Sequence, residues 1–318
     1  MSKERPLIAS LFAILLLCLP APVARALQNG DILVADRTVG LLYVDALGFQ
    51  HFLTGFVNGH GVGDVATDGS GNIYVIDSAG GAVYSVDGTT GATTLVTSGG
   101  FLQFPSSVDL LPGGDLLVVE GGPSGGVVRV HPADGAQTMA ASGVLDGLAV
   151  DGNGLVYVTR ADGVSTWHVY RVDITSGSMV LVSNTAFNNP RMMVADVAGN
   201  LILSEPQQAR ISRVDPSTGS VTLVSFDNQF MAPWGVALDA SAKIITADNQ
   251  GAPTCNPPGP VSTCRGVVFR VDPGNGAQTI VTDQDKFDDI TGVDVYHGPN
   301  VMTAARGPSW GRLKTIYR

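Results

Sequence analysis

One short phrase recurs along this chain and constrains its fold more than any other feature. The stretch RVDPSTGSVTLVS at 213–225 has close variants in SVDGTTGATTLVT, RVHPADGAQTMAA, RVDITSGSMVLVS and RVDPGNGAQTIVT. In each, the residue at the head of a predicted turn is followed four positions later by a glycine; the heads are Asp87, His131, Asp173, Asp215 and Asp272. Successive heads lie 44, 42, 42 and 57 residues apart. A phrase that returns at such intervals indicates a repeat architecture.

Each repeat unit contains four short apolar runs, such as VGDVATD, NIYVID, GAVYSVD and ATTLVTS. Runs of this length that are rich in β-branched residues and bounded by Gly, Asp, Asn and Pro predict strands joined by hairpins. We label the four predicted strands of a unit A, B, C and D. Four strands repeated roughly every 40 to 50 residues have the spacing of propeller blades, so we predict an all-β fold, a β-propeller of four-stranded blades.

The number of blades depends on how the two ends of the chain are counted. Five units contain all four strands. The chain after residue 26 begins with runs that resemble strands B, C and D (DILVAD, LLYVD, QHFLTG). It ends with runs that resemble strands A, B and C (TGVDVY, VMTAAR, RLKTIYR). Seven B-like and seven C-like runs favour seven blades, two of them abbreviated. Six blades result if the terminal strands share one blade and the surplus packs outside. In both arrangements we expect the ends to close the ring, because open sheet edges invite aggregation.

The first 26 residues have the pattern of a secretory signal peptide, with a charged start, an apolar run and small residues at Ala24 and Ala26. Leu17 before Cys18 does not fit a lipoprotein signal, so we expect a single domain over 27–318, secreted or periplasmic. That domain would carry 15 basic and 27 acidic side chains, a net charge of −12, which makes nucleic acid a poor partner. No second apolar segment is long enough to span a membrane, so we expect no membrane insertion after cleavage.

Two cysteines would remain after cleavage, Cys255 and Cys264, in the proline-rich stretch APTCNPPGPVSTC. The longer last interval between turn heads places them in an insertion at about 249–266, between strands B and C of one unit. In an exported protein, two cysteines that close a short loop predict a disulfide. We therefore expect a disulfide-bonded loop outside the propeller core.

Strand A begins and strand B ends on the same face of a propeller, so these positions should form two rings around the channel mouth. The ring at the end of B is mostly acidic: Asp36, Asp77, Glu120, Arg160, Glu205, Asp248 and Arg306. These carboxylates either bind cations or accept hydrogen bonds from the loops beside them. Recurrence of one residue type in blade after blade favours the hydrogen-bonding role.

The ring at the start of A changes chemistry from unit to unit and is therefore the candidate site. It places Asp146, Arg191 and Trp234 in consecutive units, with Asp64 and Asn189 beside it. Arg would bind a carboxylate or phosphate, Trp an apolar or sugar face, and Asp hydroxyls or a cation, which suits a small polar ligand or a partner's protein loop. The structural alternative is that Asp146 and Arg191 neutralise each other across a blade boundary while Trp234 fills space.

Phrases such as PWGVALDASAKIITAD and LDGLAVDGNGLVYVTR resemble the NHL-type propeller repeats, a broad group that includes gluconolactonase-like hydrolases and streptogramin lyases. Resemblance to the hydrolases implies a divalent cation, such as calcium, held by a Glu, two Asn and an Asp. Asp146 matches that Asp, but Ser106 with Ser107, and Gly63 with Asp64, stand where the asparagines would be wanted.

Resemblance to the streptogramin lyases implies a catalytic histidine with a carboxylate partner. His60, in NGHGVGD, is the histidine on the right face, and it could pair with Asp64. Taken together, these patterns predict an exported propeller that acts as a binding or scaffolding module with a ligand site at the channel mouth. The alternative is a metal-dependent hydrolase of the gluconolactonase or lactonase type, in which Asp146 would be a metal ligand.

Overall fold

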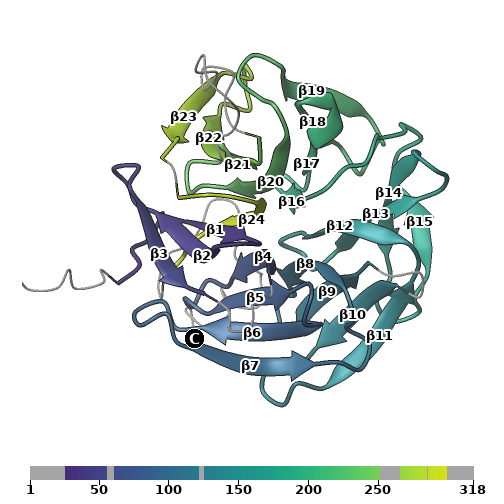
Figure 1. The fold of residues 1–318 in the computed structure, drawn as a ribbon. Helices are drawn as coiled ribbons and strands as arrows, with labels where there is room; N and C mark the ends of the chain where they lie inside the picture. Colours follow the sequence, from purple (N-terminus) through teal and green to yellow (C-terminus); the bar gives the residue numbers. More distant parts are fainter. Residues whose placement is uncertain (1–25, 56–60, 122–124, 251–265, 285, 299–318) are drawn as a thin grey trace, which may run out of the picture.

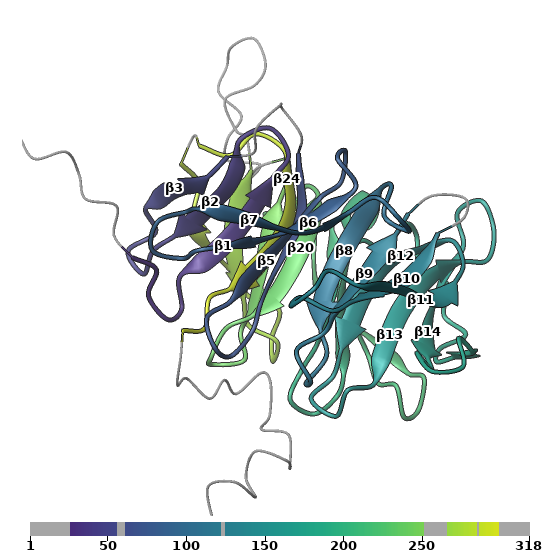
Figure 2. The ribbon, with the colours of Figure 1, turned by 90° about the horizontal axis from the view of Figure 1, so that it is seen from below.

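Six four-stranded antiparallel sheets surround a central channel in the computed structural model, which describes residues 26–55, 61–121, 125–250, 266–284 and 286–298 (Figure 1). Each sheet is one blade, and its innermost strand lies beside the channel. Figure 2 shows the blades edge-on, with turns and loops gathered on two opposite faces. Within these ranges the one helical element is the 3-10 turn η1 (Pro206–Gln208), and no helix there has the length and apolar character needed to cross a membrane.

The strands of each blade follow one another in chain order from the channel outwards, except that β24 is the innermost strand of blade 1. Blade 1 combines β24 (Ile290–Val295) with β1 (Ile32–Asp36), β2 (Gly40–Val44) and β3 (Gln50–Thr54). Blade 2 contains β4 (Val62–Thr67), β5 (Ile73–Asp77), β6 (Ala82–Val86) and β7 (Thr93–Ser98), and blade 3 contains β8 (Pro105–Leu110), β9 (Leu116–Glu120), β10 (Gly126–Val130) and β11 (Gln137–Ser142). Blade 4 contains β12 (Leu145–Val150), β13 (Val156–Ala161), β14 (Trp167–Val172) and β15 (Met179–Leu181). Blade 5 contains β16 (Met193–Ala195), β17 (Leu201–Glu205), β18 (Arg210–Val214) and β19 (Val221–Phe226), and blade 6 contains β20 (Pro233–Leu238), β21 (Ile244–Asp248), β22 (Val267–Val271) and β23 (Gln278–Thr282).

The ring closes through strands from opposite ends of the chain. β24, from the TGVDVY segment, pairs antiparallel with β1, so that Val293 lies opposite Val34 and Val295 opposite Ile32. The prediction of seven blades is therefore wrong, and the ring has six. The runs at the start of the domain and the A run near its end complete one blade instead of beginning two. The VMTAAR and RLKTIYR runs lie outside the described residues.

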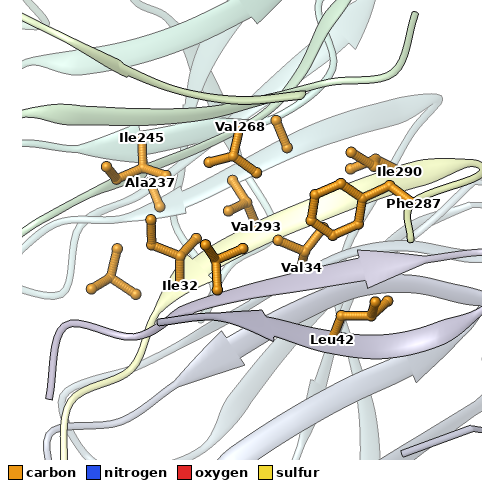
Figure 3. Close-up of a cluster of buried hydrophobic side chains, with 12 residues drawn as sticks. Ile32, Val34, Leu42, Ala237, Ile245, Val268, Phe287, Ile290 and Val293 are labelled. Carbon is orange, nitrogen blue, oxygen red and sulfur yellow. The ribbon is translucent and has the colours of Figure 1, made fainter. Parts of the chain in front are cut away.

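Apolar side chains fill the spaces between neighbouring blades. At the closure seam, Phe287 and Val293 pack with Val34 of blade 1 and with Ile245 and Val268 of blade 6 (Figure 3). All five are buried. Since removal of apolar surface from water is the main driving force for folding, each blade depends on its two neighbours for much of its stability.

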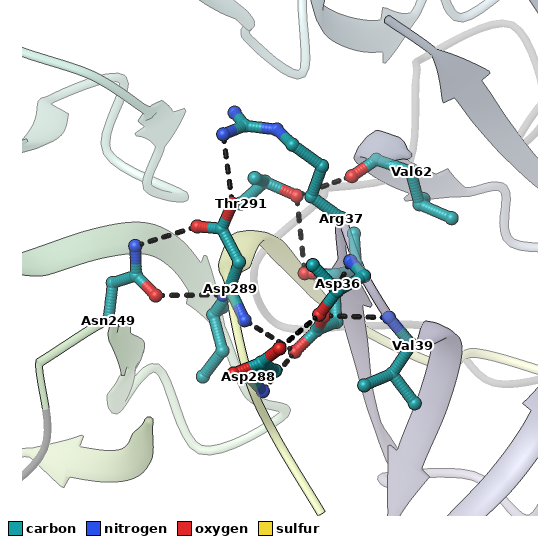
Figure 4. Close-up of polar contacts among 11 residues, drawn as sticks. Asp36, Arg37, Val39, Val62, Asn249, Asp288, Asp289 and Thr291 are labelled. Atoms are coloured by element: carbon teal, nitrogen blue, oxygen red, sulfur yellow. Dashed lines mark hydrogen bonds and ion pairs between the residues drawn. The ribbon is translucent and has the colours of Figure 1, made fainter. Parts of the chain in front are cut away.

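Polar contacts join the same seam at the face where β1 ends (Figure 4). Through Oδ2, Asp36 accepts hydrogen bonds from the backbone N–H groups of Asp288 at 2.6 Å and Asp289 at 3.0 Å. Through Oδ1, it accepts from the N–H groups of Thr38 at 2.9 Å and Val39 at 3.0 Å. One buried carboxylate therefore accepts hydrogen bonds from backbone N–H groups at both ends of the domain. Leaving these N–H groups without an acceptor would cost free energy.

The recurrent phrase forms the turn between strands C and D, and its glycine has two roles. In the turn after β6, Gly91 donates to the Asp87 carbonyl at 2.8 Å and has a φ of +70°. The equivalent glycines of the other four turns have φ between +70° and +73°. A Cβ at Gly91 would also overlap the carbonyl oxygen of Leu53 in the preceding blade. Only glycine allows both the positive φ and this close approach, which explains why the phrase recurs.

Candidate ligand site at the channel mouth

Asp146, Arg191 and Trp234 lie together at the channel mouth. Asp146 is on β12, Trp234 is on β20, and Arg191 precedes β16, so the three come from consecutive blades. Arg191 Nη1 donates to Asp146 Oδ2 at 2.8 Å. The guanidinium carbon of Arg191 lies 4.5 Å from the centroid of the Trp234 ring. The arginine is therefore held by an ion pair and by a cation–π contact.

Close packing of the backbone positions these side chains. Gly147 follows Asp146, and a Cβ in its place would lie 2.5 Å from the Arg191 carbonyl oxygen. Ser204, on β17 of the same blade as Arg191, donates from Oγ to the Trp234 carbonyl at 2.5 Å. The glycine lets blades 4 and 5 approach, and the serine joins blade 5 to blade 6, so the interior of the propeller fixes the geometry of the site.

The environment of Asp146 changes its acidity. Its side chain is 12% exposed, and burial raises the pKa of the carboxyl to about 6, although the charge of Arg191 acts in the opposite direction. Oδ2 accepts the hydrogen bond from Arg191, whereas Oδ1 receives none from the residues that the structure describes. Asp146 therefore changes charge near pH 6, well above the usual range of an aspartate.

Arg191 keeps part of its hydrogen-bonding capacity. Its side chain is 30% exposed. Within the described parts of the chain, Nη1 has an acceptor but Nη2 does not, and Nε is buried without one. Because Nε is buried, an incoming carboxylate meets Nη2, which can donate a charge-assisted hydrogen bond to it. The site therefore retains a donor for an anion.

The acidic ring at the ends of the B strands holds backbone loops in place. Glu120 accepts hydrogen bonds from the N–H groups of Gln103 and Phe104, both at 2.8 Å. Asp248 accepts one from Met231 at 2.8 Å, and burial raises the pKa of its carboxyl to about 6. Over the described ranges, no three His, Cys, Asp or Glu side chains are grouped so that they could hold a metal ion. These carboxylates thus have the hydrogen-bonding role that their recurrence favours.

Sequence reasoning missed a second set of carboxylates, which lie along the free inner edges of the blades. Each accepts a backbone N–H from the innermost strand of the next blade: Asp64 from Val108 at 3.0 Å, Asp109 from Val150 at 2.8 Å, and Asp294 from Thr67 at 2.7 Å. An edge strand exposes unpaired N–H groups, and these carboxylates satisfy them. The available signal was an aspartate within an apolar strand, as in SSVDLL and TGVDVY.

Asp64 does not join the Arg191 cluster. Successive side chains of a strand point to opposite faces, so Asp64, one place beyond the ring position, faces β8 and accepts a hydrogen bond from Ser107 at 3.2 Å. Burial raises the pKa of the Asp64 carboxyl to about 8, and the charge of Asp294 adds to this effect. Both carboxyls line a cavity of about 40 Å³ along the channel, which is space for water and not for a substrate.

The remaining predicted residues are placed as follows. Asn189 lies two residues before Arg191 and has a φ of +50°, a left-handed conformation that asparagine tolerates. His60, Cys255, Cys264, Arg306 and residues 1–25 of the predicted signal peptide lie outside the described residues.

No family model and no curated protein matches this sequence. A chain in the crystal structure of a nidogen/laminin complex has a TM-score of 0.69 and 11% identity, over 84% of this chain and 99% of that chain. TolB from Acinetobacter baumannii has a TM-score of 0.63 and 14% identity, over 83% of this chain and 66% of that chain. A streptogramin B lyase has a TM-score of 0.51 and 13% identity, over 69% of this chain and 67% of that chain. At such identities the likeness shows a shared β-propeller fold, and it does not single out the NHL-type repeat.

Proposed function

We propose that this protein is an exported binding module whose channel mouth recognises a carboxylate through Arg191. The observation that carries the proposal is a guanidinium fixed by Asp146 and Trp234 whose Nη2 donor still has no acceptor in the described structure. Because its orientation is set before binding, Arg191 would lose little conformational freedom when a ligand arrives. Export is proposed from the N-terminal pattern of residues 1–26 and from the disulfide predicted between Cys255 and Cys264.

A carboxylate suits the site better than a phosphate. Asp146 lies beside the arginine, and the whole chain has a net charge of −10, so an anionic ligand meets repulsion that grows with its own charge. A singly charged carboxylate meets less of this repulsion than a phosphate. Repulsion by Asp146 disappears when its carboxyl is protonated, so binding should strengthen as the pH falls through 6.

The comparisons support a binding role without naming a ligand for this chain. One similar fold comes from a nidogen/laminin complex, where a propeller of this kind is part of a protein assembly. The alternative of a gluconolactonase-type hydrolase has less support. It needs Asp146 as a ligand of a cation, yet the guanidinium of Arg191 occupies one of its oxygens and repels positive charge.

A titration with 4-fluorobenzoate, followed by ¹⁹F NMR line broadening, tests the proposal. We expect the wild type to bind this probe and Arg191→Gln to bind it at least about tenfold more weakly, the loss expected for a charge-assisted hydrogen bond. Arg270→Gln is the matched control, because Arg270 is also paired with a carboxylate, Asp239 at 3.0 Å, but lies away from the mouth on β22. A folded Arg191→Gln protein that binds like the wild type would show that the proposal is wrong.

A further inference from the structure

An uncharged region borders the candidate site on the same face of the propeller. Residues 78–81, 99–104, 121, 125 and 143–144 lie in loops at the mouth face of blades 2 and 3 and just before blade 4, and they include no Asp, Glu, Lys, Arg or His. We call these residues the uncharged sector. It exposes three large apolar side chains: Phe101 is 46% exposed, Phe104 is 59% exposed and Val144 is 48% exposed.

Backbone hydrogen bonds join neighbouring loops of the uncharged sector. The bonds run from Gly99 N–H to the Gly81 carbonyl at 2.9 Å, from Gly121 to Phe104 at 3.1 Å, and from Gly143 to Gly125 at 2.9 Å. Val144 precedes Asp146 by two residues, so the sector extends to the edge of the Arg191 site.

The opposite face of the propeller has a different character. Its turns carry a series of acidic side chains, among them Asp87, Asp115, Asp173, Asp215 and Asp272. The cores of protein–protein interfaces are depleted of charged residues and enriched in aromatic ones, which is the composition of the uncharged sector.

We infer that the uncharged sector and Arg191 together dock a loop of a partner protein that presents an Asp or Glu side chain flanked by apolar side chains. The inference rests on the proposed function and names its ligand class. Charge complementarity to Arg191 selects the carboxylate, and Phe101, Phe104 and Val144 select the apolar flanks.

A protein loop suits this surface better than a small molecule, because Arg191 and the exposed Phe101, Phe104 and Val144 lie on loops of different blades. The described channel cavity of about 40 Å³ is lined by Asp64 and Asp294 and not by Arg191, so we place the partner across the mouth and not in the channel. Apolar contacts beside the ion pair would exclude water, and such exclusion strengthens the pair.

The test uses a phage-displayed library of disulfide-closed nine-residue loops, selected on the full-length protein at about pH 6. We expect the selected loops to carry Asp or Glu beside apolar or aromatic residues. A synthetic selected loop should bind Arg191→Gln at least about tenfold more weakly and the double variant Phe101→Ser/Phe104→Ser at least about fivefold more weakly. Phe52→Ser is the matched control, since Phe52 is 57% exposed on the outer strand β3 and should have no effect. If Arg191→Gln folds poorly, Arg191→Lys replaces it in the test. This variant keeps the charge but lacks the planar guanidinium, and it should bind the loop with intermediate affinity.

The outcomes separate this inference from the proposed function. If 4-fluorobenzoate needs Arg191 but no selected loop needs Phe101 and Phe104, the site takes small carboxylates, and the inference of a protein loop is overturned while the proposed function stands. If neither probe needs Arg191, both are overturned. Loops that lack a carboxylate and bind Arg191→Gln unchanged would also overturn the inference.

Discussion

The guanidinium carbon of Arg191 lies 4.5 Å from the centre of the Trp234 ring. The sequence suggests that Trp234 offers its ring face to a ligand, but in the structure Arg191 covers a face of that ring. We therefore expect Trp234 to act as a positioning residue that orients the arginine.

Replacement of Trp234 tests this role. Trp234→Leu should weaken 4-fluorobenzoate binding about three- to tenfold, because a cation–π contact contributes about 0.5 to 2 kcal/mol to the orientation of the cation. Trp234→Phe keeps an aromatic face and should retain most of the affinity. Equal losses in the two variants, measured by the same ¹⁹F titration, would contradict the positioning role.

The seam carboxylate Asp36 should be important for stability. Asp36→Ala leaves the part-buried backbone donors of Asp288 and Asp289 without their acceptor, so we expect the free energy of unfolding in urea to fall by about 1 to 3 kcal/mol. Asp87→Ala, in an exposed turn, also removes an acceptor for backbone N–H groups. Water can take the place of that carboxylate, so the free energy of unfolding should fall much less. Similar losses in both variants would argue against a special role of the seam.

Closure of the ring by β24 predicts where the chain can be shortened. A protein that ends at residue 298 retains β24 and should melt cooperatively, near the temperature of the full-length protein. A protein that ends at residue 289 lacks β24, so it exposes the edge of β1 and the apolar side chains that pack around Val293, and it should not fold cooperatively. Circular dichroism melts compare the two. Cooperative melting of the shorter protein would contradict closure through β24.

Asp64 should make stability depend on pH in a defined direction. Its pKa is raised by burial to about 8 in the folded protein, so folding favours the protonated carboxyl. The associated stability is fully present below the unfolded pKa near 4 and is lost as the pH rises towards and through 8. Melting temperatures measured from about pH 5 to 9 should therefore fall with rising pH more steeply in the wild type than in Asp64→Asn. Parallel curves would show that Asp64 does not titrate in this way.

Much of the fold follows from local chemistry that is visible in the sequence. The phrase that contains Gly91 marks a turn because its glycine must adopt a positive φ, and equal strand positions bring Asp146, Arg191 and Trp234 to one mouth. The number of blades cannot be predicted from local sequence, because it depends on whether the first and last strands share a sheet. The pairing of β1 with β24 decides it.

The chemistry of individual site residues was harder to predict. Asp64 sits one residue beyond the ring position, and the alternation of side chains along a strand turns it towards the neighbouring blade. Burial and hydrogen-bond partners depend on residues that are distant in sequence, which is why the inner-edge role of Asp109 and Asp294 was missed.

The pH dependence of carboxylate binding decides whether Arg191 recognises an anion in competition with Asp146. The Asp146 carboxyl has a pKa raised to about 6, and when ionised it competes with the ligand for the guanidinium. In the ¹⁹F titration, the wild type should bind 4-fluorobenzoate several-fold more tightly at about pH 5 than at about pH 7.5, whereas Asp146→Asn should bind it tightly and equally at both. Binding by the wild type that does not change with pH, or that is lost in Asp146→Asn as expected of a metal ligand, would contradict carboxylate recognition by Arg191.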